Sequence, residues 1–429
     1  MAQARTRRER SRRDRTSRRV SLRRAQNLSL RGLLGPDPTG AVQSLLALLA
    51  SCVTATAAGV LLAGITGTLE RLPGLLVLVP AAIGMRGNIF GALGSRLSTT
   101  IHAGTFRVSR RVDNVVGQNV LAAAVLSLVT AVALGAMTKA LAPAFGLEGI
   151  ISLADLVVVS TAGALLSSLV VLLVTLGLAS MSARYGWDLD NVNAPLVSAV
   201  GDVVTLPALF AASALVSVQV FTPVAAALLA LGAVVSLVTG MRTSLQELRA
   251  IMRESLPILL VTGGVLVFAG VVIEHRLEDF AAFPAVLVLV PACLAGAGAI
   301  GGILSGRLAS KLHLGVVEPT VLPRRSARRD LWFGFVLAIP VFLVNGLLAH
   351  LAGGLFDFAS PGLWRLLVIS MLGGVLATLL ACVIAYYGTV VAIRVGVDPD
   401  TYGIPLVTST VDLAGAAAIV AAISWVGLT

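Results

Sequence analysis

Long apolar runs follow one another along the chain from Ala41 to Trp425, separated by short segments rich in charge, proline or glycine. Each run has about 20 residues or more, the length that a helix needs to cross a hydrocarbon core of about 30 Å. The runs lie at residues 41–66, 73–103, 115–140, 151–182, 194–217, 221–241, 256–275, 283–313, 330–353, 361–393 and 403–427. The pattern predicts an all-α integral membrane protein with about eleven transmembrane helices.

Two parts of the chain repeat one another at a nearly constant offset. The segment Pro73-Gly-Leu-Leu-Val-Leu-Val-Pro80 returns 211 positions later as Pro284-Ala-Val-Leu-Val-Leu-Val-Pro291. The segment from Pro195 to Asp202 returns 210 positions later as the segment from Pro405 to Asp412. The chain therefore contains two copies of one unit, and each copy has five of the predicted helices.

The number of helices decides how the two copies are related. Two directly joined five-helix units would face opposite ways in the membrane, but the extra run at 221–241 crosses it once more. We therefore expect two parallel five-helix repeats, related by a pseudo-two-fold axis along the membrane normal, plus one linking helix. The predicted boundaries are 1–40 for an N-terminal tail, 41–218 for the first repeat, 219–255 for the linking helix and its loop, and 256–429 for the second repeat.

Charge is concentrated in the connections and in the tail. Only 12% of the residues are charged, against about 25% in soluble domains, yet the net charge is +11. Twelve arginines lie within residues 1–31, and contact with anionic lipid explains them without a nucleic-acid partner. With a cytoplasmic N-terminus, 25 of the 32 lysines and arginines fall in cytoplasmic segments, as the positive-inside rule requires. We predict a disordered cytoplasmic tail and a protein of the plasma or inner membrane.

Neither a disulfide framework nor a membrane enzyme fits the distribution of reactive side chains. The three cysteines, Cys52, Cys293 and Cys382, are an odd number and lie inside apolar runs, which argues against a disulfide framework or a cysteine-based zinc site. The four histidines are scattered, and no nucleophile and base are clustered. We predict that the chain is not an enzyme and needs no cofactor.

Two aspartates carry the candidate chemistry. Asp202 and Asp412 lie about two turns inside apolar runs, each seven residues after a proline. A carboxylate at the centre of a bilayer costs about 2.5–3.5 kcal/mol even on insertion scales, so it marks a functional site unless it is protonated or paired with an arginine. A parallel two-fold brings equivalent residues toward one axis, where two carboxylates repel each other unless a cation lies between them. The sequence predicts a metal site at Asp202 and Asp412.

Oxygen ligands without clustered cysteine or histidine suit a hard cation such as Mg²⁺, which keeps much of its water. Polar side chains near the aspartates, or in the glycine-rich part of the second apolar run, are candidates for lining its path: Asn88, Ser198, Thr205, Thr408 and Ser409. The alternative for the hydroxyls is ordinary packing between helices, and for the amide a break in packing.

The sequence also resembles a known family. The segment Pro80-Ala-Ala-Ile-Gly-Met-Arg-Gly-Asn88, followed by Ser95-Arg-Leu-Ser-Thr99, is similar to the signature of the MgtE-type magnesium channels and of solute carrier family 41. The segments 188–202 and 398–412 resemble two copies of the pore-helix motif of that family. The resemblance covers nearly everything from Ala41 to the C-terminus.

The resemblance implies two five-helix units around a central pore, in which acidic residues near the axis bind hydrated divalent cations. It assigns this role to Asp202 and Asp412, with Asn88 as a further candidate. One departure concerns the second repeat, where Ala299 occupies the position equivalent to Asn88. We expect an asymmetric pore with weaker ligation on that side.

Transport of a divalent cation, Mg²⁺ first among them, through a pore at the repeat interface is the leading prediction. A carrier that exchanges or exports divalent cations against Na⁺ or H⁺ is the alternative. A membrane scaffold or receptor is a remote third reading, because it leaves the two buried aspartates unexplained. The predicted partners are the cation and membrane lipid, with no nucleic acid, and the internal duplication allows a single chain to function as a monomer.

Overall fold

The computed structural model describes residues 38–107, 114–186, 189–216, 218, 220–276, 282–313, 320, 322–395 and 404–427. This part of the chain is all-helical and contains no strand. The tail that we predict to be disordered lies outside the described residues as far as residue 37.

Eleven helices in the described part are long and apolar enough to cross a membrane, which confirms the predicted fold class. The helices are α2 (Pro38–Gly64), α3 (Thr66–Arg71), α4 (Leu75–His102), α5 (Val115–Ala144), α6 (Leu153–Tyr185), α7 (Asp190–Ser213), α8 (Phe221–Arg242), α9 (Gln246–Glu274), α11 (Pro284–His313), α12 (Arg325–Leu355), α13 (Leu363–Val395) and α14 (Ile404–Val426). The short helix α3 is not among the eleven.

Helix α9 begins ten residues before the predicted start at residue 256. Its first turns alternate exposed charged residues such as Glu247 with the buried side chains of Leu248, Ile251 and Met252. A search for uninterrupted apolar runs misses such turns, because one face of the helix is polar.

The first helix of each repeat packs against the other repeat. Helix α2 lies on α11 and α12, and α9 lies on α4 and α5. A Cβ atom built on Gly59 of α2 would lie 2.4 Å from the carbonyl oxygen of Val288 in α11, and one on Gly270 of α9 would lie 2.1 Å from that of Val77 in α4. The two contacts are equivalent, because Gly59 corresponds to Gly270 and Val77 to Val288 at the repeat offset of 211. Glycines therefore let the backbones of the two repeats pack closely about a two-fold axis.

Contacts at the helix ends show that the repeats face the same way. The segment that joins α2 to α4 lies beside the start of α6, because the backbone N–H of Ile151 donates to the carbonyl oxygen of Pro73 at 3.2 Å. At the same end of the bundle, the carbonyl oxygen of Phe145, directly after α5, lies 2.7 Å from Nε2 of His275, directly after α9. Helices α2 and α9 therefore end on the same side, as the parallel arrangement requires.

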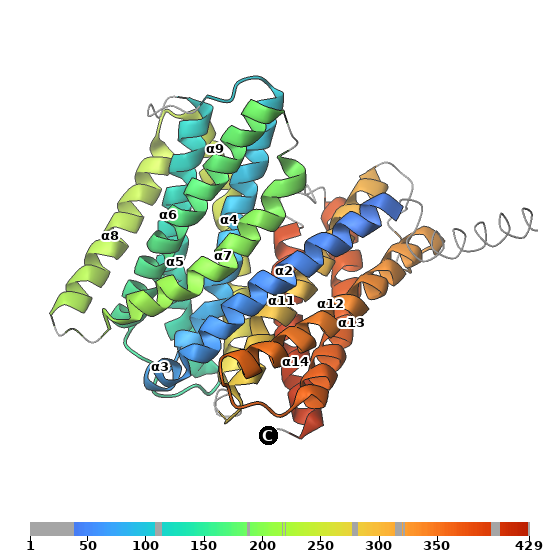
Figure 1. Ribbon diagram of the computed structural model, residues 1–429. Coiled ribbons are helices and arrows are strands. Elements are labelled where there is room, and N and C mark those ends of the chain that lie inside the picture. Colours follow the sequence, from blue (N-terminus) through green and yellow to red (C-terminus); the bar gives the residue numbers. More distant parts are fainter. Residues whose placement is uncertain are drawn as a thin grey trace, which may run out of the picture.

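Helix α8 lies at the edge of the bundle, as Figure 1 shows, and packs on α5, α6 and α9. Its outward residues are exposed, Leu228 at 63% and Leu231 at 60%, which suits contact with lipid. By contrast, all residues from Leu75 to Ala82 in α4 and from Ala285 to Leu294 in α11 are buried. The core is therefore built around the second helix of each repeat, and α8 is the predicted linking helix.

Candidate metal site between the repeats

The two predicted aspartates lie on equivalent helices, Asp202 on α7 and Asp412 on α14. Asp202 is only 6% exposed, and Asp412 is half-buried. Helix α4 packs on α7 and also contacts α14, so the two aspartates lie on helices that meet the same helix of the first repeat. Among the described residues, no lysine, arginine or histidine forms an ion pair with either carboxylate. Their negative charge is therefore not offset by a salt bridge within the described part.

Asp412 rests on a glycine of α11. A Cβ atom built on Gly298 would lie 2.6 Å from Oδ1 of Asp412. Helix α14 approaches α11 closely along this line, because a Cβ on Gly301 would lie 3.0 Å from Val411 and one on Gly302 would lie 3.4 Å from Thr408. The glycines of α11 thus allow the carboxylate to lie directly on the neighbouring helix.

Asn88 lies on the corresponding helix of the first repeat, α4, and is half-buried. Its Nδ2 atom is buried and has no hydrogen-bond partner, a situation that is uncommon for buried amides. A Cβ atom on Gly87 or Gly91 would meet no other heavy atom within 4 Å, so this face of α4 borders open space. An unpaired N–H donor beside open space is suited to donate to a water molecule.

The four predicted hydroxyls make no hydrogen bond to either aspartate within the described residues. Thr205 is completely buried and donates to the carbonyl oxygen of Gly201 at 2.6 Å, and Thr408 donates to that of Pro405 at 3.1 Å. Ser409 is buried, whereas Ser198 is exposed. Thr205 and Thr408 thus use their protons within their own helices, as the packing interpretation expects.

Sequence reasoning missed Arg86, a buried arginine within a membrane-spanning helix. The side chain is 2% exposed, its Nε donates to Oγ of Ser167 at 3.0 Å and its Nη1 to Oγ of Ser168 at 3.4 Å, both on α6. The described part shows no ion pair between Arg86 and an acidic residue. The sequence contained the signal for Arg86. A charged side chain within an apolar helix is costly in a membrane, and this argument applies to an arginine as it does to the two aspartates.

No group of three or more histidine, cysteine, aspartate or glutamate side chains that could hold a metal ion occurs among the described residues. Such a group is what a zinc site needs. Mg²⁺ is commonly held by one or two carboxylates while it keeps several waters. Two carboxylates therefore suit a hydrated Mg²⁺ ion better than a bare transition metal.

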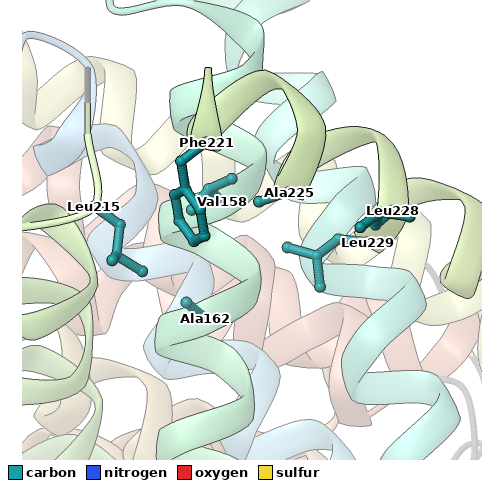
Figure 2. Close-up of a pocket in the computed structure, with 7 residues that line it drawn as sticks. All are labelled: Val158, Ala162, Leu215, Phe221, Ala225, Leu228 and Leu229. Carbon is teal, nitrogen blue, oxygen red and sulfur yellow. The ribbon is translucent and has the colours of Figure 1, made fainter. Parts of the chain in front are cut away.

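Two cavities in the bundle do not contain any of the predicted site residues. One, of about 300 Å³, lies between α6 and α8, and Figure 2 shows its seven lining side chains, all of them apolar. The other, of about 450 Å³, lies between the ends of α2 and α12 and the later part of α7. Their apolar linings offer no side-chain oxygen to a cation.

A comparison with known protein families matches residues 79–212 and 290–422 to MgtE, described as a divalent cation transporter. The two matches begin 211 positions apart, as the repeats do, and together cover more than half of the 429 residues. The chain belongs to the MgtE divalent cation transporter family. Asp202 and Asp412 each lie within one of the MgtE regions, whereas α2, α8 and α9 lie outside them. No solved structure matches the chain.

Membership in the MgtE family confirms the predicted resemblance and the duplication. It establishes divalent cation transport as the general activity, and it agrees with the eleven apolar helices of an integral membrane protein. MgtE is a family of transporters, which supports the prediction that the chain is not an enzyme.

Proposed function

We propose that this MgtE protein moves Mg²⁺ through a pore at the interface of its two repeats, and that Asp202 and Asp412 together bind the hydrated ion. The observation that carries the proposal is a pair of carboxylates at repeat-equivalent positions within membrane-spanning helices that both contact α4, without a basic partner among the described residues.

The energetic argument concerns the cost of the two charges. Each carboxylate costs several kcal/mol when it leaves water, and their mutual repulsion adds to that cost. A divalent cation between them offsets both terms, and its remaining water shell can hydrogen-bond polar groups such as the amide of Asn88. Of the other predicted residues, Ser198, Thr205, Thr408 and Ser409 act through this water shell or through helix packing.

The proposal extends to the setting of the protein. We place it in the plasma or inner membrane with its N-terminus in the cytoplasm, on the strength of the arginine and lysine distribution. One chain contains both halves of the pore, so a monomer suffices, and the transported cation is cargo rather than a cofactor. Lipid is the remaining partner, and no nucleic acid is involved.

Ion flux into proteoliposomes tests the assignment of the site. Asp202→Asn and Asp412→Asn should each leave a folded protein with reduced Mg²⁺ flux, and the double variant should carry none. Asp357→Asn serves as the matched control, because Asp357 is exposed and its positive φ of 57° is tolerated by asparagine. Parental flux in the folded double variant would falsify the site.

The same preparation separates a pore from a coupled carrier. A membrane potential alone should drive Mg²⁺ uptake through a pore. A strict requirement for an opposing Na⁺ or H⁺ gradient would instead identify an exchanger, and would leave the two-aspartate site intact.

A further inference from the structure

The contact between Gly298 and Asp412 is closer than any side chain allows. A Cβ atom at position 298 would lie 2.6 Å from Oδ1, 3.6 Å from Cγ and 3.9 Å from Oδ2 of Asp412. A separation of 2.6 Å is well inside van der Waals contact, so the smallest side chain at this position would force a displacement.

The equivalent glycine of the first repeat is different. A Cβ atom on Gly87 meets nothing within 4 Å, so Asp202 is not seated on α4 in this way. Beside Asp202, a Cβ on Gly201 would instead lie 3.5 Å from the Cβ of Arg86, which is ordinary contact. The close contact between a glycine and the carboxylate is therefore a property of the second repeat.

Helix α14 has little room to retreat from a new methyl group. On its other side it packs on α13, where a Cβ on Gly373 would lie 3.2 Å from Cα of Ile419 and one on Gly388 would lie 2.8 Å from Val407. Since the backbone is held from both α11 and α13, the side chain of Asp412 must rotate. A rotated carboxylate changes its distance to Asp202 and to an ion between them.

We propose that Gly298 is a positioning residue for the cation site: the absence of a side chain at this point seats the Asp412 carboxylate against α11 and sets its geometry toward Asp202. This inference rests on the proposed function. Binding sites tolerate ligand displacements of only about 0.5 Å, so one methyl group is enough to weaken the site.

Gly298→Ala tests the proposal in Mg²⁺ flux into proteoliposomes. The apparent KM for Mg²⁺ should rise at least fivefold, and the stabilisation of the purified protein against heat by added Mg²⁺ should shrink. Gly177→Ala is the matched control, because Gly177 lies within α6 and a Cβ there meets nothing within 4 Å. That variant should keep the parental KM.

A double-mutant cycle distinguishes positioning from packing. An Asp412→Ala background removes the carboxylate that the new methyl group would meet. Adding Gly298→Ala there should change the remaining flux by less than about twofold and the melting temperature by less than about 2 °C. If Gly298→Ala alone unfolds the protein, recovery of the fold in this background supports the same contact.

Two results would overturn the inference. One is a parental KM in folded Gly298→Ala together with impaired flux in Asp412→Asn, which leaves the proposed function standing. The other is an equal loss from the methyl group whether or not Asp412 is present, which makes Gly298 a packing residue. Parental flux in Asp412→Asn would instead remove the proposed site itself.

Discussion

In the first repeat Gly163 of α6 lies against Leu209 of α7, and in the second repeat Gly373 of α13 lies against Ile419 of α14. The hydroxyl of Ser160 donates to the carbonyl oxygen of Ala131 at 2.8 Å, and its counterpart Ser370 donates to that of Phe342 at 2.6 Å. These contacts involve backbone atoms and small side chains, and the duplication has kept them in both halves.

Buried polar groups differ between the same two halves. Arg86 corresponds to Ala297, and Asn88 corresponds to Ala299. Ser167 and Ser168, which hold Arg86, correspond to Ala377 and Thr378. At these positions the half of the bundle around α4 carries the additional polar groups.

Glu274 adds a further polar group to that half. It ends α9, which belongs to the second repeat in sequence but packs on α4, and its Oε1 accepts a hydrogen bond from the backbone N–H of Gly74 at 2.9 Å. The equivalent residue at the end of α2 is Ala63. Backbone contacts therefore constrain both repeats, whereas the polar groups are matched to the neighbours that each half supplies.

The largest effect is expected from transferring the buried arginine to the other half. Ala297 is completely buried, and alanine at 377 replaces Ser167, which accepts from Nε of Arg86, so a guanidinium at 297 lacks one of the two hydroxyl acceptors that Arg86 has. Ala297→Arg should lose about 3–5 kcal/mol of stability, the cost of an unpaired buried charge, and yield little folded protein.

Arg86→Met is the counterpart of that change. It fills the space with an apolar side chain of similar length, so its effect on thermal unfolding in detergent should be much smaller. Parental stability of Ala297→Arg in the same assay would show that the second half does supply a partner for the charge.

An intermediate effect is expected at Glu274. The carboxylate is 8% exposed and holds the N–H that precedes α4, so Glu274→Ala should cost about 1–3 kcal/mol by leaving a buried donor unsatisfied. Glu274→Gln keeps a carbonyl oxygen for this bond and should lose less. Thermal unfolding of the two variants measures the difference, and equal losses would mean that the hydrogen bond is not what matters.

The smallest effect is expected at position 299, where the second repeat has alanine in place of the amide of Asn88. Ala299 is half-buried at the position equivalent to Asn88, so Ala299→Asn should add a polar group for the hydrated ion. We expect a gain in Mg²⁺ affinity of a few-fold, below the tenfold that corresponds to about 1.4 kcal/mol. Binding titrations should show the opposite change for Asn88→Ala. An unchanged affinity in both variants would exclude the amides from the site.

Much of this architecture is determined by the sequence alone. Apolar runs of membrane-spanning length, the parity of their number and the offset of the repeats identify eleven helices and two parallel units. The same duplication singles out Asp202 and Asp412, because a charge within an apolar helix is costly wherever the helix packs. These properties follow from the order of residues along the chain, so no knowledge of the neighbouring helices is needed to find them.

Other features were decided only by the tertiary structure. The exchange of α2 and α9 between the repeats, the seat of Asp412 on Gly298 and the hydrogen bonds of Arg86 to α6 all join residues that are far apart in the chain. Within a membrane, hydropathy does not specify which helix faces which, because lipid is as apolar as a helix surface. Close backbone contacts at glycines and hydrogen bonds of buried polar groups make that choice, and both exist only once the helices have packed.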